Sequence, residues 1–528
     1  MTEWDADALY RALVARDARF DGHFFVGVSS TSIYCRPVCR ARTPRKPNCT
    51  FYRTAAQAEA AGFRPCLLCR PERAPGTSTL EARSDLARQA AQILQDTCGD
   101  GLSLEDLARR LGCSSRHLRR VFVDAYGVSP AAHLRTCRLL LAKQLLTDTA
   151  LSVADVAMAS GFGSVRRFND VFRERYRLSP TALRAQRRSL PGTDEGGPAR
   201  RAAPDGVTLG LGYRPPYRWD DILRFLEARA IPGVEAVRRA PAADGDAGEA
   251  GGEYARTVRV VAGDGTPRAG WVRVGNGPRS HVLTVTLAPS LLPVLPQVLA
   301  RVSHLFDLSC DPRIVADALD PALNHVRPGA FRAGTRVPGC FDAFEMAARA
   351  ILGQQVSVQA ARTLAGRVAA DDALGTAIDT GITGLTRLFP TPETIAALSA
   401  PGEVEDRLGP LGITRTRARS LLAIAQGIAD GTLALDPRAD PARAVAALQA
   451  IPGVGPWTAN YLAMRALGWP DVFLEADIGI RRALAPPAEA APPSSRATRR
   501  PAPAELRAMA EAWRPWRSYA TVSLWNSL

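Results

Sequence analysis

The chain has 528 residues, a formal net charge of +15 and an isoelectric point near 9.8. A single hydrophobic core does not grow to this size, so several domains are expected, and an apolar content of 46% excludes a largely disordered chain. The charge favours a polyanionic partner, but an arginine-rich surface on an ordinary soluble protein would give the same value, so its distribution must decide.

The N-terminal segment and the cysteines indicate the compartment. Residues 1–10, MTEWDADALY, lack the basic and apolar regions of a signal peptide, and no apolar run approaches the roughly 20 residues of a membrane helix. We therefore expect a cytoplasmic protein with no membrane partner. Five of the ten cysteines lie between Cys35 and Cys69, and in a reducing compartment such a cluster indicates metal binding or catalysis.

Four of these cysteines form two close pairs. Cys35 and Cys39 are followed, after a longer loop, by Cys66 and Cys69, which is the way a chain builds a tetrahedral four-sulfur zinc site. The remaining one, Cys49, is interpreted as a small buried apolar residue. Basic residues, among them Arg36 and Arg45, surround the cluster and indicate a site that faces phosphate. Spacing alone leaves open whether the zinc site is only structural or also reactive.

The context of the cluster, FFVGVSSTSIYCRPVCR and AGFRPCLLCRP, resembles the N-terminal domain of the adaptive-response regulators (Ada family). The resemblance implies one Zn²⁺ bound by the four cysteines, and a methyl transfer from an alkylated DNA phosphate to Cys35. A zinc-bound thiolate is deprotonated yet nucleophilic, so this chemistry is reasonable. Methylation would reduce the negative charge of the site, and DNA affinity should rise.

An internal repeat follows the cysteine cluster. LSLEDLARRLGCSSRHLRRVFVDAYGVSP (102–130) returns as LSVADVAMASGFGSVRRFNDVFRERYRLSP (151–180), each copy with apolar residues at helical spacing around a glycine turn. Gly112 should end one helix, and Ser114 or Ser115 should begin the next. Helix, tight turn and helix is the helix-turn-helix arrangement.

The second helix of each copy is basic. Arg116 and Arg119 in the first, and Arg166 and Arg167 in the second, are expected to contact DNA, although a solvated basic face is the plain alternative for either helix alone. Residues 82–188 resemble the AraC family of transcription regulators, which implies recognition of two adjacent segments of the major groove.

Beyond the Pro/Gly-rich stretch 189–206 the pattern changes. ARTVRVVAG and HVLTVTLAPS are predicted strands, and the sequence is helical after about residue 318. In LQAIPGVGPWTANYLAMRAL a helix runs into a glycine turn at Gly453 and Gly455, and another helix begins at Pro456, an arrangement that can present backbone N–H groups to a phosphate. Asp477 follows in an apolar setting; either motif by itself is weak, and together they are typical of base-excision glycosylases.

Residues 207–528 resemble the inducible 3-methyladenine glycosylases (AlkA type) through PPYRW, VPGCFDAFEMAARAILGQQVS, IPGVGPWTANYLAMRA, DVFLEAD and WRPWRSYATVSLW. The resemblance makes Asp477 the catalytic aspartate and Gly453, Gly455 and Thr458 DNA contacts. It places Gln355, where the family has leucine, at the DNA wedge, and Ala476 where it has an acidic residue. The aromatic side chains expected around the flipped base are Phe225, Trp457, Tyr461 and Trp525, and cationic alkylated purines should stack on them.

Two activities and one cofactor loop are expected to be missing. Trp457 occupies the place of the Schiff-base lysine of bifunctional glycosylases, so base removal should be monofunctional. No cysteine-rich iron–sulfur loop is found at the C-terminal end. No cysteine is followed by His-Arg, so the O6-alkylguanine transferase activity of many adaptive-response regulators should be absent.

The sequence therefore predicts a multidomain protein of α/β and all-α parts. A small four-cysteine zinc α/β domain (1–75) precedes an AraC-type double helix-turn-helix (82–188), a linker (189–206), an α+β domain (207–318) and helix-hairpin-helix glycosylase domains (319–528). The predicted function joins methylphosphotriester-activated transcription control to excision of N-alkylated purines, with double-stranded DNA and RNA polymerase as partners at the bacterial nucleoid. The alternatives are a regulator whose glycosylase half only binds DNA, and a glycosylase with a purely structural zinc module.

Overall fold

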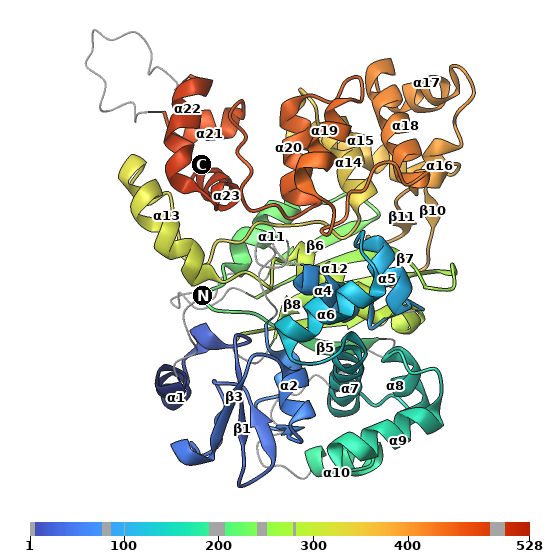
Figure 1. Cartoon of the computed structure of the whole chain (residues 1–528). Coiled ribbons are helices and arrows are strands. Elements are labelled where there is room, and N and C mark those ends of the chain that lie inside the picture. The colour runs from blue at the N-terminus through green and yellow to red at the C-terminus, as the bar shows by residue number, and fades with distance from the viewer. Residues whose placement is uncertain are drawn as a thin grey trace. The chain divides into compact units, whose positions relative to one another are not determined.

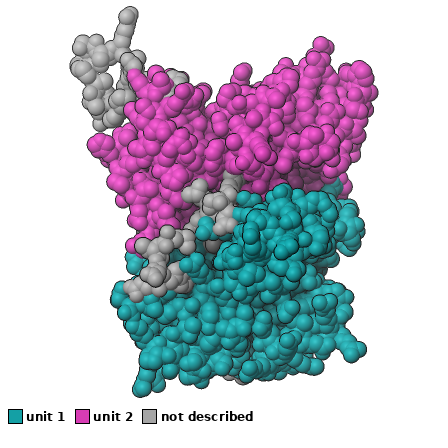
Figure 2. Space-filling model, viewed as in Figure 1, with its two compact units in different colours: residues 1–215, 258–303 teal, residues 216–257, 304–528 magenta. Residues whose placement is uncertain are grey.

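The computed structural model describes residues 6–75, 86–99, 101–188, 206–239, 251–277, 281–485 and 502–528. The chain divides into two compact units: residues 1–215 with 258–303, and residues 216–257 with 304–528 (Figure 2). The predicted linker 189–206, except Gly206, and most of the segments 240–253 and 485–503 fall outside the described residues. No described helix is long and apolar enough to cross a membrane.

The first unit begins with a small α/β fold. After α1 (Ala6–Val14), strands β1 (Phe25–Val28), β2 (Ile33–Cys35), β3 (Cys49–Tyr52) and β4 (Arg64–Pro65) form a sheet in the order β3-β1-β2-β4 (Figure 1). Helix α2 (Ala55–Ala60) packs on the sheet, where Phe25, Tyr34, Ala55 and Ala58 form the core. The interpretation of Cys49 as buried is wrong: it lies on the edge strand β3 and is half-buried, with its thiol directed to the carbonyl of Arg45.

Seven helices follow and confirm the helix-turn-helix repeat. They are α4 (Leu86–Thr97), α5 (Leu104–Arg110), α6 (Ser115–Tyr126), α7 (Pro130–Asp148), α8 (Val153–Ala159), α9 (Val165–Tyr176) and α10 (Pro180–Arg188). Ser114 is the residue that caps α6, because its hydroxyl accepts the backbone N–H of His117 at 3.2 Å. Gly112 and Gly161, with φ of 67° and 83°, make the two turns in a left-handed conformation.

Helix α7 is joined to the zinc fold by buried charges. The Lys143 ammonium, fully buried, donates to Glu72 at 2.5 Å, and Asp148 accepts from Arg70 and from Arg73, the latter at 2.9 Å. Arg70 also donates to Glu72 at 2.8 Å. Lys143 is one of only two lysines in the sequence; the other, Lys46, pairs with Asp7 at the surface.

A second buried contact joins α2 to α7 and α9. The Glu59 carboxylate is fully buried and accepts hydroxyl hydrogen bonds from Tyr34 at 3.2 Å, Thr136 at 2.9 Å and Tyr176 at 3.3 Å. Burial raises the pKa of Glu59 to about 7 despite these donors. The zinc fold and the helix-turn-helix repeat therefore share an interior in the first unit.

Antiparallel strands follow the linker. In the first unit β5 (Val207–Gly212) pairs with β9 (Val282–Leu287), which pairs with β8 (Pro267–Asn276); in the second unit β6 (Glu235–Arg239) pairs with β7 (Gly252–Val261) through residues 252–256. The strands predicted from ARTVRVVAG and HVLTVTLAPS are β7 and β9. Helices begin earlier than predicted, with α12 (Leu295–Leu305) and α13 (Pro312–Val326).

The second unit is mainly helical. It contains α11 (Trp219–Glu227), α14 (Ala343–Leu352), α15 (Val358–Ala370), α16 (Pro392–Ala396), α17 (Glu403–Leu408), α18 (Arg415–Ala429), α19 (Pro441–Gln449), α20 (Pro456–Arg465), α21 (Ile478–Ala483), α22 (Pro503–Ala510) and α23 (Arg517–Asn526). Helices α14, α15 and α17 to α20 bury one apolar core that includes Ile351, Leu421 and Leu462. This core supports the turn between α19 and α20.

Candidate metal centre and base-excision site

The sheet of the zinc fold brings the two cysteine pairs together. Strands β2 and β4 are parallel and in register, Tyr34 opposite Pro65, so Cys35 and Cys66 follow side by side, joined by the Cys66 N–H donating to the Tyr34 carbonyl at 3.0 Å. Tight turns then return Cys39 and Cys69 to the same place. The four sulfur atoms lie within 4.8 Å of one another.

This sulfur set fits zinc. Four thiolates at such distances would repel one another unless a divalent cation lay among them. Cys39 and Cys66 are buried, whereas Cys35 and Cys69 are half-buried. One Zn²⁺ is the cofactor of this site.

Arg36 is tied into the metal centre. Its guanidinium pairs with the buried carboxylate of Asp21 and donates to the Cys69 carbonyl at 3.0 Å, and its backbone N–H points at the Cys69 sulfur at 3.3 Å. The contact of Arg36 with DNA stays a prediction, but its charge is already balanced by Asp21. Arg45 is exposed and has no such carboxylate partner among the contacts of the described residues.

The two helices predicted to read DNA present their basic residues to solvent. Arg116 and Arg119 on α6, and Arg166 and Arg167 on α9, are exposed, while Phe122 and Phe168 are buried beneath them. Four guanidinium groups on the surface of two repeated helices form an arrangement suited to a polyanion.

The turn between α19 and α20 has the hairpin geometry. Gly453 has a φ of 86°, and a Cβ there would lie 2.4 Å from the Ser420 hydroxyl, so glycine is required. Gly453 and Gly455 are exposed, and Pro456 begins α20. Thr458 is instead buried, and its hydroxyl lies 3.2 Å from the Gln354 side-chain amide, so it braces the hairpin from inside.

Asp477 is held in one orientation by three N–H groups. Its Oδ1 caps α21 by accepting the Ile480 backbone N–H at 2.9 Å, and it also accepts the indole N–H of Trp525 at 2.9 Å. Its Oδ2 accepts the indole N–H of Trp457 at 3.2 Å. A carboxylate offers about four acceptor positions, so accepting capacity remains.

The four predicted aromatic side chains come together around Asp477, from α11, α20 and α23. The Trp457 and Tyr461 rings are stacked, with centroids 5.0 Å apart. Phe225 and Trp525 are nearly parallel, with centroids 6.2 Å apart and an interplanar angle of 16°. Parallel aromatic faces beside a fixed carboxylate suit a flat heterocycle.

Two arginines that the sequence analysis did not single out lie on these rings. The Arg229 guanidinium carbon is 3.7 Å from the Phe225 centroid; that of Arg465 is 4.8 Å from the same centroid and 5.5 Å from that of Tyr461. Each arginine follows its aromatic partner by four residues, Phe225 to Arg229 and Tyr461 to Arg465. That spacing on a helix was the available signal.

The predicted wedge residue lies at the start of an exposed loop between α14 and α15. Gln355 is exposed and has a φ of 54°, a left-handed conformation unusual for a side chain of this size. Its neighbour Gln354 donates to the Gly453 carbonyl at 2.9 Å, and the Gln354 carbonyl accepts from Arg417. The wedge loop is therefore fixed to the hairpin.

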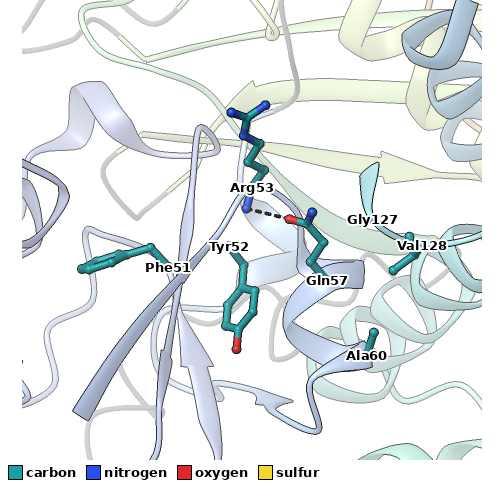
Figure 3. A pocket seen from close by; sticks show the side chains of 7 residues that line it. All are labelled: Phe51, Tyr52, Arg53, Gln57, Ala60, Gly127 and Val128. Atoms are coloured by element: carbon teal, nitrogen blue, oxygen red, sulfur yellow. Dashed lines mark hydrogen bonds between the residues drawn. The ribbon is translucent and has the colours of Figure 1, made fainter. Parts of the chain in front are cut away.

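A shallow hollow lies in the first unit, away from all predicted site residues. It encloses about 470 Å³ and is lined by Phe51, Tyr52, Arg53, Gln57, Ala60, Gly127 and Val128 (Figure 3). The Arg53 backbone N–H donates to the Gln57 side chain at 2.9 Å and closes one wall. No polar side chain in it is deeply buried, and we assign it no ligand.

The fold and the sites define a class: a four-cysteine zinc domain and a double helix-turn-helix joined to a helix-hairpin-helix DNA glycosylase. Four family models match accordingly, described as metal binding domain of Ada (residues 8–72), helix-turn-helix domain (107–186), AlkA N-terminal domain (208–342) and HhH-GPD superfamily base excision DNA repair protein (348–499). DNA is thus the partner of the chain.

Similar proteins cover the whole chain. A Mycobacterium tuberculosis protein described as "Probable bifunctional transcriptional activator/DNA repair enzyme AlkA" is 37% identical over 99% of this chain and 97% of its own length. The Escherichia coli DNA-3-methyladenine glycosylase 2 is 38% identical over 60% of this chain and 95% of its own. The Escherichia coli bifunctional transcriptional activator/DNA repair enzyme Ada is 35% identical over 30% of this chain and 42% of its own.

The chain belongs to the family of bifunctional transcriptional activator/DNA repair enzymes of the AlkA type. The resemblances to the Ada, AraC-type and AlkA proteins are confirmed, and so are the predicted fold classes.

Proposed function

We propose that the C-terminal half excises N-alkylated purines of the 3-methyladenine class from double-stranded DNA, with Asp477 as the catalytic carboxylate. The observation that carries the proposal is the fixed Asp477, hydrogen-bonded to the indoles of two of the four clustered aromatic residues. A flipped base would stack on the rings, and its C1′–N bond would break with both electrons passing to the base. The remaining Asp477 lone pair would stabilise the cationic sugar and orient the water that adds to C1′.

Base removal is proposed to be monofunctional. Strand cleavage by a glycosylase needs an amine that forms a Schiff base with the sugar. Residues 207–528 contain no lysine at all, and Trp457 follows the hairpin where such a lysine would stand. The glycosylase half therefore has no side-chain amine for this chemistry.

An Asp477→Asn variant tests the proposal. The amide keeps the size of the side chain and removes its charge, so single-turnover release of 3-methyladenine should fall by about 10²–10³-fold. Glu475→Gln is the matched control, because Glu475 pairs with Arg507 at the surface, away from the rings. Borohydride should trap no covalent enzyme–DNA product. Release by Asp477→Asn at the wild-type rate would show that Asp477 is not the catalytic carboxylate, and absence of release by the wild type would favour a glycosylase half that only binds DNA.

We further propose that Cys35 accepts a methyl group from a DNA methylphosphotriester. The support is that Cys35 is half-buried in a sulfur set in which Cys39 and Cys66 are buried, and that the sulfur of Cys69, also half-buried, is covered by the Arg36 backbone N–H at 3.3 Å. Bound Zn²⁺ would keep the sulfurs as thiolates. The Cys35 sulfur would attack the methyl carbon, an S–C bond would form, and the C–O bond would break with its electrons passing to the phosphate diester.

Methylation at Cys35 is testable by peptide mass mapping. Zinc-loaded protein incubated with DNA that carries methyl phosphotriesters should gain one methyl group on Cys35. Cys49→Ser should behave as the wild type, because Cys49 lies on the edge strand β3, outside the sulfur set. An unmodified Cys35 in zinc-loaded protein would leave the N-terminal half as a structural DNA-binding module.

The transcriptional output would pass through the helix-turn-helix repeat. We propose that the loss of one negative charge at the metal centre strengthens promoter binding by α6 and α9, and that RNA polymerase is then recruited at the nucleoid. The exposed Arg116, Arg119, Arg166 and Arg167 support the DNA contact.

A further inference from the structure

Two guanidinium groups lie against the aromatic rings of the candidate base-excision site. Arg229 lies over Phe225, and its guanidinium donates to the Phe225 carbonyl at 3.1 Å. Arg465 lies over Phe225 and Tyr461, and donates to the Tyr461 hydroxyl at 2.7 Å. A face that already binds a guanidinium is less available to a second cation.

Neither arginine is free to leave. Arg465 is 2% exposed and donates to the carbonyls of Pro338 and Gly339, the latter at 3.0 Å. The backbone on which Arg229 stands is held by Arg349, which donates to the Arg229 carbonyl at 2.8 Å, and by Arg362, which donates to the Ala230 carbonyl at 2.7 Å. The charges are thus built into the pocket.

The two cations also act on each other. Burial lowers the pKa of Arg229, and the charge of Arg465 lowers it further, against the opposing effect of Tyr461. Keeping both guanidinium groups charged beside the Tyr461 hydroxyl and the Phe225 ring therefore costs free energy. Such a cost is typical of groups that serve recognition.

We propose that Arg229 is a specificity-determining residue which, together with Arg465, lowers the excision of cationic bases relative to neutral bases. The inference rests on the proposed glycosylase function. A cationic alkylated purine would be repelled by two guanidinium groups close to the ring on which it stacks. The expectation that cationic purines stack on these aromatic faces stays a prediction, and the proposal limits how far such stacking favours them.

The chemistry of the departing base also favours neutral over cationic bases at this site. A neutral purine takes both electrons of the broken C1′–N bond and becomes an anion until it is protonated, so nearby guanidinium groups stabilise its departure. A cationic purine leaves as a neutral molecule and gains nothing from them. The arginines would therefore make the excision rates of cationic and neutral purines more similar, and they would widen the range of lesions excised.

The test compares two duplexes under single-turnover conditions with the full chain: one with 7-methylguanine, which is cationic, and one with hypoxanthine, which is neutral. Arg229→Met removes the charge and keeps an unbranched chain over Phe225, so the ratio of the cationic to the neutral rate should rise about tenfold. Arg229→Lys keeps the charge and should stay within about twofold of the wild-type ratio.

Arg224→Met is the matched control, because Arg224 is an exposed arginine on α11, the helix that precedes Arg229, and it pairs with Asp221. It should leave the ratio unchanged. A purely structural role of Arg229 would lower both rates together and leave their ratio unchanged. An unchanged ratio in Arg229→Met would overturn this inference but not the proposed glycosylase function. Inactivity of the wild type on both duplexes would overturn the proposed glycosylase function and the inference with it.

Discussion

Asp477 would combine, in the proposed mechanism, a structural and a chemical task in one carboxylate. It caps α21 through the Ile480 N–H, and the same oxygen accepts the Trp525 indole. The cap fixes the carboxylate relative to the helix, and the two indoles fix it relative to the aromatic pocket. Precision of this kind matters because a stabilising charge acts only where the sugar cation develops.

His133 on α7 is a residue whose ionisation should oppose folding. Its two ring nitrogens are shielded from water and have no polar partner among the described residues, while its ring packs against Phe122 with centroids 5.4 Å apart. Burial lowers the pKa of His133 to about 4. The folded chain thus keeps a neutral imidazole where the unfolded chain, with a pKa near 6.5, would bind a proton.

Acid should therefore destabilise the helix-turn-helix repeat through His133. As pH falls from about 6.5 to 4 the unfolded state binds the proton that the folded state refuses, and the free energy of unfolding decreases by roughly 3 kcal/mol. In His133→Met the protection of α6 and α7 amides from hydrogen exchange should depend less on pH between 7 and 5. An equal dependence in both proteins would show that other groups control acid stability.

Helix α7 connects parts of the first unit that are distant in the sequence. On it, Thr136 contacts Glu59, and Lys143 and Asp148 contact Glu72, Arg70 and Arg73. Tyr34 precedes the zinc ligand Cys35, and Arg70 follows the ligand Cys69. The metal centre and the helix between the two DNA-reading modules are therefore braced by the same buried contacts.

The Lys143–Glu72 pair should be worth far more than a surface pair. Lys143→Met would leave Glu72 buried with Arg70 as its remaining cation, and removing one partner of a buried pair costs about 3–5 kcal/mol. Hydrogen exchange of the α7 amides should accelerate accordingly. Lys46→Met is the matched control: it removes an exposed pair with Asp7 and should change stability by at most about 1 kcal/mol. Equal effects of the two variants would mean that the buried pair contributes little.

Over the whole molecule, the sequence predicts the features that depend on local spacing, but not those that depend on contacts between distant segments. The cysteine pairs, the repeat with its serine caps and the glycine hairpin with Asp477 are short patterns, so the sequence predicts them. The α7 ion pairs join segments far apart in the sequence, so no local pattern predicts them. The Arg229–Phe225 stack has a local four-residue spacing, but spacing alone does not show that the two side chains face the aromatic site. Cys49 was misjudged because a strand at the edge of a sheet has no distinct local pattern, and the onset of helices was placed too late because α12 and α13 follow the strands directly.

The positive charge of the chain is almost entirely guanidinium, because only Lys46 and Lys143 are lysines and Lys143 is sealed inside the first unit. Guanidinium groups stay protonated at any pH that occurs in a cell, and lysine acetylases do not modify them. Among the lysines, acylation could reach only Lys46, which lies outside α6 and α9 but beside Arg45, a predicted DNA contact of the zinc fold. Lysine acylation, the commonest covalent modification that neutralises basic surfaces, would therefore leave the charge of α6 and α9 unchanged.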